Sequence, residues 1–177
     1  PLPQLEQWFH SRYREVQDSI VPLPYARDFL EFCRARRLRT FLLSSVATEH
    51  YDKQAKSSGL GQFLDRAYSG VFDKREKIHG ILTEHSLNPD ETLFIGDMEH
   101  DIATARHGGI HAVAVLTGYN TLNQLRAAGP DLICEHLGEL RDLLESHDLQ
   151  IKPAIERFEE SHPPIATVGG LIFDNQG

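Results

Sequence analysis

Cysteine, long apolar runs and an excess of positive charge are all missing from this 177-residue chain. Its two cysteines, Cys33 and Cys134, lie far apart in apolar stretches and form no CxxC pair, so we expect two reduced core residues. No run approaches the roughly 18 apolar residues that span a bilayer, and the N-terminus lacks the pattern of a signal peptide. The sequence therefore predicts a cytoplasmic protein without a membrane partner.

Acidic residues outnumber basic ones, 26 Asp and Glu against 18 Lys and Arg, which gives a formal net charge of −8. Such a surface repels phosphate polymers, so the sequence predicts no nucleic-acid partner. An anionic small substrate would need a local positive element, such as a metal ion, a lysine or a helix N-terminus. The hydrophobic share of 40% is typical of a folded globular chain, and the length fits one domain of ordinary size.

Short apolar runs alternate with amphipathic stretches along most of the chain. Strands are predicted at 39–43, 68–71, 92–95, 111–116 and 131–134, and helices at 5–20, 29–37, 49–58, 76–85, 102–106, 122–128 and 137–145. This alternation is typical of an α/β fold, with a doubly wound, mostly parallel sheet and helices on both faces.

Composition also divides the chain. We expect one domain over residues 1–147, a linker rich in charge and proline over 148–164, and the first strand of a further domain over 165–177.

Four polar residues follow predicted strands, at the edge where a parallel sheet binds ligands. Ser44 follows the first strand, Lys74 comes just beyond the second, and Asp97 follows the third. Asp101 lies four residues after Asp97, about one helical turn on, so the two carboxylates converge. Carboxylate oxygens bind hard divalent cations, and the pair therefore predicts a Mg²⁺ site.

Each of these residues also has a purely structural interpretation. Asp97 could cap the following helix while Asp101 supplies a first-turn charge, and Ser44 could act only as a cap. Lys74 could be an ordinary exposed lysine on a turn.

Histidines surround the acidic pair, at His100, His107 and His111. They form no HxH or HExxH spacing, so we expect solvated or capping roles and no zinc site.

The stretch GDMEHDIATARHGG, after a buried strand, resembles the fourth motif of the haloacid dehalogenase-like (HAD) hydrolases. FLLSS resembles the second motif of that family, with Ser44 at the matching position. FDKREKIHGIL resembles the third, with Lys74 as the better match and Lys77 as the fallback. The resemblance covers roughly residues 20–145, in the order of the family, and is greatest to the phosphoglycolate phosphatase branch.

The resemblance implies a Mg²⁺-dependent phosphatase acting on a small phosphorylated metabolite. In the family an aspartate nucleophile attacks the phosphoryl group, and the residues matching Ser44 and Lys74 hold phosphoryl oxygens. Asp97 and Asp101 match the acidic pair that holds Mg²⁺. Metal and lysine would supply the positive element that a phosphate ester needs here.

The first motif of the family, DxDx(T/V), is missing from residues 1–43, although its strand should precede Ser44. One interpretation is that the chain is part of a longer phosphatase and is inactive without the nucleophile. The alternative is a HAD-like module that has lost catalysis and serves as a binding or regulatory domain.

The C-terminal PPIATVGGLIFDNQG resembles the opening strand of a Nudix hydrolase domain. A permuted first motif, with Asp174 as nucleophile, is a poorer match because Gln176 replaces the second aspartate and cannot transfer a proton. An unrelated strand also stays open.

The missing motif has a consequence for the sheet. In the HAD fold the first-motif strand lies between the strands that end at Ser44 and Asp97, so its absence leaves a slot. Residues 165–173 could fill this slot, the flanking strands could close up, or the gap could remain.

Overall fold

The structure is a computed structural model, and it describes residues 19–152 together with positions 4, 8, 11, 12, 15 and 155. The chain divides into two compact units, Pro1–Arg141 and Asp142–Gly177, and Ser44, Lys74, Asp97 and Asp101 all lie in the first. Within the predicted linker, residues 151, 152 and 155 are helical. The run at 165–177 lies outside the described residues, so the domain boundaries and the Nudix resemblance stay predictions.

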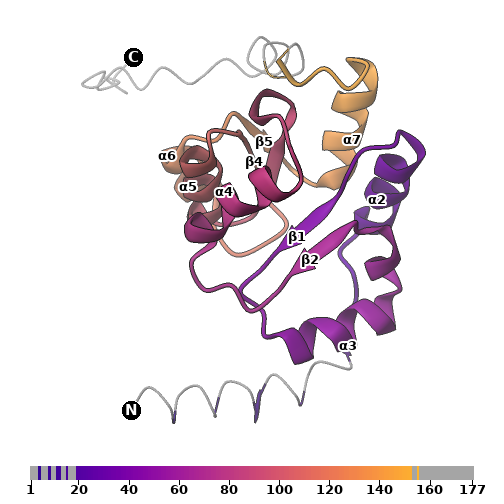
Figure 1. The fold of residues 1–177 in the computed structure, drawn as a ribbon, viewed down its shortest axis with the longest axis vertical. Helices are drawn as coiled ribbons and strands as arrows, with labels where there is room; N and C mark the ends of the chain where they lie inside the picture. Colours follow the sequence, from indigo (N-terminus) through magenta and orange to yellow (C-terminus); the bar gives the residue numbers. More distant parts are fainter. Residues whose placement is uncertain are drawn as a thin grey trace, which may run out of the picture. The chain divides into compact units, whose positions relative to one another are not determined.

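Helices and strands alternate along the described chain (Figure 1). The α-helices are α2 (Ala26–Ala35), α3 (Thr48–Ser58), α4 (Lys74–Glu84), α5 (Glu99–Gly108), α6 (Leu122–Ala128) and α7 (Leu137–Ser146). The strands are β1 (Phe41–Leu43), β2 (Arg66–Tyr68), β3 (Leu93–Gly96), β4 (His111–Val115) and β5 (Leu132–Cys134). Two 3₁₀ turns, η2 (Leu60–Phe63) and η3 (Pro89–Glu91), precede β2 and β3.

All described strand pairs are parallel. β1 pairs with β2, and β3, β4 and β5 form a separate sheet with β4 in the centre. This arrangement confirms the predicted α/β fold with parallel strands. No pairing joins β1 to β3 within the described residues, so of the three open outcomes the one in which these strands close up is excluded there. Two strands pair only where their main-chain groups lie within hydrogen-bonding reach, and β1 and β3 form no such pair in the described residues.

The core is formed by β4 and the helices next to it. Val113 and Ala114 are fully buried in the central strand, and Ala114 packs in one cluster with Ile102 of α5 and Leu125 of α6, which are also closed to solvent. α4 packs against α5. A Cβ on Gly108 would lie 2.8 Å from Cγ1 of Ile78, so the small residue sets how closely these two helices approach.

Several predicted boundaries were wrong. The second strand was predicted at 68–71 but is Arg66–Tyr68, because Gly70 adopts a φ of 71° and turns the chain. The Gly70 N–H donates to the Val46 carbonyl at 2.7 Å, and this hydrogen bond fixes the turn against the loop after β1. α4 and α5 begin earlier than predicted, at Lys74 and Glu99, because polar groups at their N-termini take up the first free N–H groups.

Both cysteines are free and buried, as predicted. Burial raises the pKa of Cys33 to about 11 and that of Cys134 to about 12, so neither thiol is ionised near neutral pH. In the described part of the chain, no helix is long and apolar enough to cross a bilayer.

Candidate active site

A mostly buried ion pair joins two of the candidate residues, Lys74 and Asp101. Lys74 Nζ donates to Asp101 Oδ1 at 2.6 Å, and their side chains are only 17% and 5% exposed. Lys74 is the first residue of α4, whose start is capped by Asp73, and Asp101 lies in the first turn of α5. The packing of α4 against α5 therefore brings lysine and carboxylate together at the end of β3.

Asp101 uses both of its carboxylate oxygens. While Oδ1 accepts from Lys74, Oδ2 accepts from the main-chain N–H of Met98 at 3.2 Å, at the start of α5. A Cβ on Gly96 would collide with the Asp101 carboxylate, so glycine at the end of β3 leaves the space that this side chain occupies. Asp101 therefore positions Lys74 and also accepts a hydrogen bond from the main chain at the start of α5.

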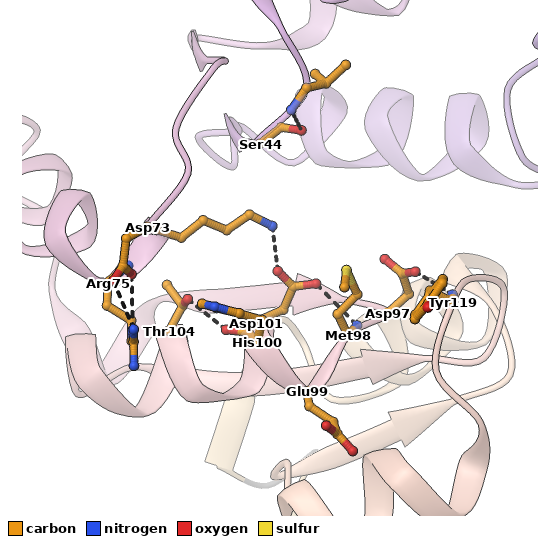
Figure 2. Close-up of polar contacts among 12 residues, drawn as sticks. Ser44, Asp73, Arg75, Asp97, Met98, Glu99, His100, Asp101, Thr104 and Tyr119 are labelled. Atoms are coloured by element: carbon orange, nitrogen blue, oxygen red, sulfur yellow. Dashed lines mark hydrogen bonds and ion pairs between the residues drawn. The ribbon is translucent and has the colours of Figure 1, made fainter. Parts of the chain in front are cut away.

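Asp97 is held by a different part of the chain (Figure 2). Its Oδ2 accepts from the main-chain N–H of Tyr119 at 2.6 Å, and its carbonyl accepts from Asn120 N at 3.1 Å. Both donors belong to the turn between β4 and α6. No hydrogen bond from the described residues reaches Oδ1 of Asp97.

Ser44 lies on another segment. It follows β1, and its Oγ accepts from the Val46 N–H at 3.2 Å, a local turn contact (Figure 2). Of the four predicted residues, the structure brings Lys74 and Asp101 into direct contact, with Asp97 beside the same helix start. No hydrogen bond joins Ser44 to the other three within the described residues.

The structural interpretations have different outcomes. Asp97 does not cap α5, because Met98 is the N-cap residue and the Asp97 carboxylate faces Tyr119. The first-turn role of Asp101 is confirmed, through its bond to Met98 N–H. Lys74 is not an exposed lysine, while the fallback Lys77 lies over the ring of Tyr68, with Nζ 5.0 Å from the centroid.

The histidines do not join the acidic pair. His111 lies with Nε2 3.3 Å from the Asp90 carbonyl, and His107 packs edge-on against His79 with ring centroids 4.9 Å apart. Among the described residues, no group of three or more His, Cys, Asp and Glu side chains could hold a metal ion. The carboxylate oxygens of Asp97 and Asp101 are of the ligand type that Mg²⁺ prefers.

The described fold is similar to that of solved proteins. A candidate β-phosphoglucomutase from Thermotoga maritima superposes with a TM-score of 0.70 at 18% identity, over 82% of this chain and 70% of its own. A haloacid dehalogenase-like hydrolase from Streptococcus pneumoniae superposes with a TM-score of 0.59 at 26% identity, over 67% of this chain and 57% of its own. The chain has the HAD-like fold. The parallel strands and flanking helices are those of this Rossmann-type architecture.

Sequence comparison supports the same resemblance. Residues 74–140 match the HAD-hydrolase-like family model. The phosphoglycolate phosphatase of Synechococcus elongatus is 29% identical over 132 residues, which cover 72% of this chain and 62% of that protein. The phosphoglycolate phosphatase of Chromobacterium violaceum is 28% identical, over 79% of this chain and 64% of its own. The chain therefore spans less than two thirds of the length of these curated relatives.

Sequence reasoning did not identify the contacts of the turn at Gly118, Tyr119 and Asn120. These residues hold Asp97 from a position more than 20 residues later in the chain. The available signal was Gly118, three residues after the end of an apolar strand, because glycine allows a chain to approach another group closely. The carboxylate that it approaches could be found only from the fold.

Proposed function

We propose that this chain is the phosphoryl- and Mg²⁺-binding part of a HAD-superfamily phosphatase, similar to phosphoglycolate phosphatase, that hydrolyses small phosphate monoesters. The observation that carries this proposal is the buried Lys74–Asp101 pair, beside Oδ1 of Asp97, which accepts no hydrogen bond from the described residues. A cation and a lysine side by side would offset the negative charge of a phosphate ester on a protein of net charge −8.

Each residue has a proposed role. Asp97 binds the metal through Oδ1, with water completing the coordination, and Asp101 supports the metal and orients Lys74. Lys74 and Ser44 bind phosphoryl oxygens. Bound Mg²⁺ would neutralise charge on the phosphoryl group. Lys74 cannot turn freely, because Asp101 fixes its Nζ, and a fixed donor loses little entropy on binding an anion.

Metal binding tests the proposal directly. We expect the wild-type protein to bind Mg²⁺ weakly, because the acidic pair offers few protein oxygens, and Asp97→Asn to abolish this binding. The matched control is Glu99→Gln. It removes a negative charge two residues after Asp97, from a side chain that points away from Asp97 (Figure 2). Isothermal titration calorimetry measures both. Equal binding by wild type and Asp97→Asn would remove Asp97 from the metal role.

Catalysis needs a nucleophile that residues 1–43 do not supply in a DxD motif. We therefore propose that the 177-residue chain by itself releases no phosphate from p-nitrophenyl phosphate or phosphoglycolate in the presence of Mg²⁺. Steady release that is lost in Asp174→Asn would contradict this part of the proposal and would point to Asp174 as a candidate nucleophile. A colorimetric phosphate assay measures the release.

A second candidate function is favoured by the same missing motif, namely a HAD-like module that binds or regulates without catalysis. The two candidates differ in whether a DxD-bearing strand precedes Pro1 in the full-length protein. Sequencing the gene upstream of the Pro1 codon decides between them. A DxD followed by Thr or Val favours the phosphatase, and its absence favours the binding module.

The cellular setting belongs to the proposal as well. A cytoplasmic location fits a small phosphorylated metabolite as substrate and two reduced buried thiols. A fusion to a Nudix domain rests on the resemblance of residues 163–177 alone. Immunoblotting of fractionated cells for this chain checks the location and the size of the full-length protein together.

A further inference from the structure

The turn after β4 makes three contacts around the start of α5. Tyr119 N–H donates to Asp97 Oδ2 at 2.6 Å, and Asn120 N–H donates to the Asp97 carbonyl at 3.1 Å. In return, the Asn120 side-chain Oδ1 accepts from the N–H of Glu99, the first residue of α5, at 2.9 Å. The residue that follows β3 is thus held at both its side chain and its main chain.

We propose that the turn formed by Gly118, Tyr119 and Asn120 positions the Asp97 carboxylate for a divalent cation, by fixing Oδ2 so that Oδ1 faces the metal. This inference rests on the proposed function and deepens it. It assigns positioning residues that make no contact with the ligand themselves.

Gly118 allows the turn to approach Asp97. A Cβ at this position would collide with Oδ2, Cγ and Cβ of Asp97, so even alanine would displace the carboxylate or the turn. The steric demand is specific to the acidic side chain, because all three of the nearest atoms belong to Asp97. Loss of the contact would free the carboxylate to rotate, and a rotating ligand loses entropy when it binds a metal.

Asn120 fixes the turn to α5. Its side chain takes up one of the free N–H groups at the helix start, while its main chain bonds the residue where β3 ends. Both hydrogen bonds of Asn120 reach main-chain groups within one short stretch, residues 97–99. Movement of the turn relative to α5 would therefore break both bonds at once. A carboxylate held in this way keeps one orientation before the metal arrives.

The hydrogen bonds to the carboxylate oxygens of Asp97 and Asp101 indicate different roles for the two residues. Both oxygens of Asp101 are occupied, by Lys74 and by Met98 N–H. In Asp97 only Oδ2 accepts a hydrogen bond from the described residues. The pair therefore presents one unbonded oxygen, and the turn decides where that oxygen points.

The test compares two Gly→Ala variants in the full chain. Gly118→Ala should weaken Mg²⁺ binding roughly 10–100-fold, the usual effect of losing a group that orients a metal ligand. Gly80→Ala is the matched control, since a Cβ there meets nothing within 4 Å, and it should bind Mg²⁺ like the wild type. Calorimetry gives the affinities, and thermal denaturation shows whether each variant is folded. Wild-type affinity in folded Gly118→Ala would overturn the proposal.

A second pair of variants, Asn120→Ala and Asn120→Asp, tests the proposal if Gly118→Ala does not fold. Asn120→Ala removes the acceptor of the Glu99 N–H and should also weaken Mg²⁺ binding, whereas Asn120→Asp keeps that acceptor and should restore most of the affinity. A purely stabilising role predicts that both variants change the melting temperature and leave the affinity unchanged. That result would overturn the proposal.

A readout without metal separates this inference from the proposed function. The Tyr119 amide proton should resonate downfield in the free protein, because it bonds to a carboxylate, and should move upfield in Asp97→Asn and Gly118→Ala. If the wild type binds no Mg²⁺, the proposed function and the cation role of the turn both fail. If it binds Mg²⁺ but the amide signal does not move in either variant, only the turn inference fails.

Discussion

At the scale of single residues, the Lys74–Asp101 pair combines a structural role with a candidate functional one. An ion pair at such low exposure gains little over an apolar pair of the same size, because both charges lose their hydration. Breaking it is costly, since one charge is then left buried without its partner. We therefore propose that the two charges at this edge of the sheet serve anion binding rather than stability.

Removal of the lysine charge gives the first prediction. Lys74→Met should lower the free energy of unfolding by about 3–5 kcal/mol, because Asp101 stays buried without its cation. Urea denaturation measures this change. Lys53→Met, on the exposed side of α3, is the matched control and should stay within about 0.5 kcal/mol of wild type.

The double variant tests the cause. Adding Asp101→Asn to Lys74→Met removes the unpaired charge while keeping an oxygen for the Met98 N–H, so it should recover part of the loss. If Lys74→Met proves as mild as Lys53→Met, the pair contributes no buried charge and this explanation is wrong.

At the scale of elements, the start of α4 decides where Lys74 lies. Asp73 is the N-cap residue, and its Oδ1 accepts from Arg75 N–H at 3.0 Å. The Arg75 guanidinium also donates to both carboxylate oxygens, at 3.0 and 2.9 Å. Hydrogen bonds from the Arg75 side chain, and then from its main chain, hold the pKa of Asp73 at about 2, below its ordinary value of 3.8.

The lowered pKa predicts an acid dependence with a definite sign. The unfolded chain takes up the Asp73 proton at higher pH than the folded chain, so the stabilisation is complete above about pH 4 and is lost as the pH falls toward 2. The difference in unfolding free energy between wild type and Asp73→Asn should therefore shrink between pH 6 and pH 2.5. Other carboxylates titrate equally in both proteins. A constant difference over this range would show that Asp73 does not contribute in its charged form.

At the scale of the whole molecule, the notable feature is that β1 and β3 belong to separate sheets in the described residues. The two parts of the first unit are connected through α4 instead. Arg39 Nη1 donates to the carbonyl of His85, the residue that follows α4, at 2.7 Å, and the Tyr68 hydroxyl donates to Glu84 at 2.8 Å. Within the described residues, β1 pairs with no strand other than β2, and β3 pairs with no strand other than β4.

Hydrogen exchange tests whether a further segment pairs with β1 or β3. We predict that residues 165–173, which lie outside the described part, pair with β1 or β3, so that removing residues 165–177 speeds amide exchange in both strands. β4 is the internal control, because it lies between β3 and β5 and should exchange slowly in either protein. Equal exchange with and without the C-terminal run would exclude this pairing. The run would then be better explained as the first strand of the next domain.

The sequence by itself determined the fold class and the order of the site residues, because hydrophobic periodicity and short motifs are local properties of the chain. It correctly predicted parallel strands, two buried free cysteines and the placement of Asp97 and Asp101 around the end of β3. Lys74 was preferred to Lys77 from the motif alone; the structure shows its contact with Asp101, and its phosphate-binding role stays a prediction. These features depend on neighbouring residues or on fixed spacings.

Only the tertiary structure decided what each carboxylate oxygen binds. The contact of Tyr119 N–H with Asp97 joins residues 22 positions apart, and the contact of Lys74 with Asp101 joins residues 27 positions apart. Neither pairing follows from periodicity, because it depends on how closely a turn or a helix packs against another element. Gly118 and Gly96 show this most directly, since the space that each leaves is occupied by an aspartate that only the folded chain brings there.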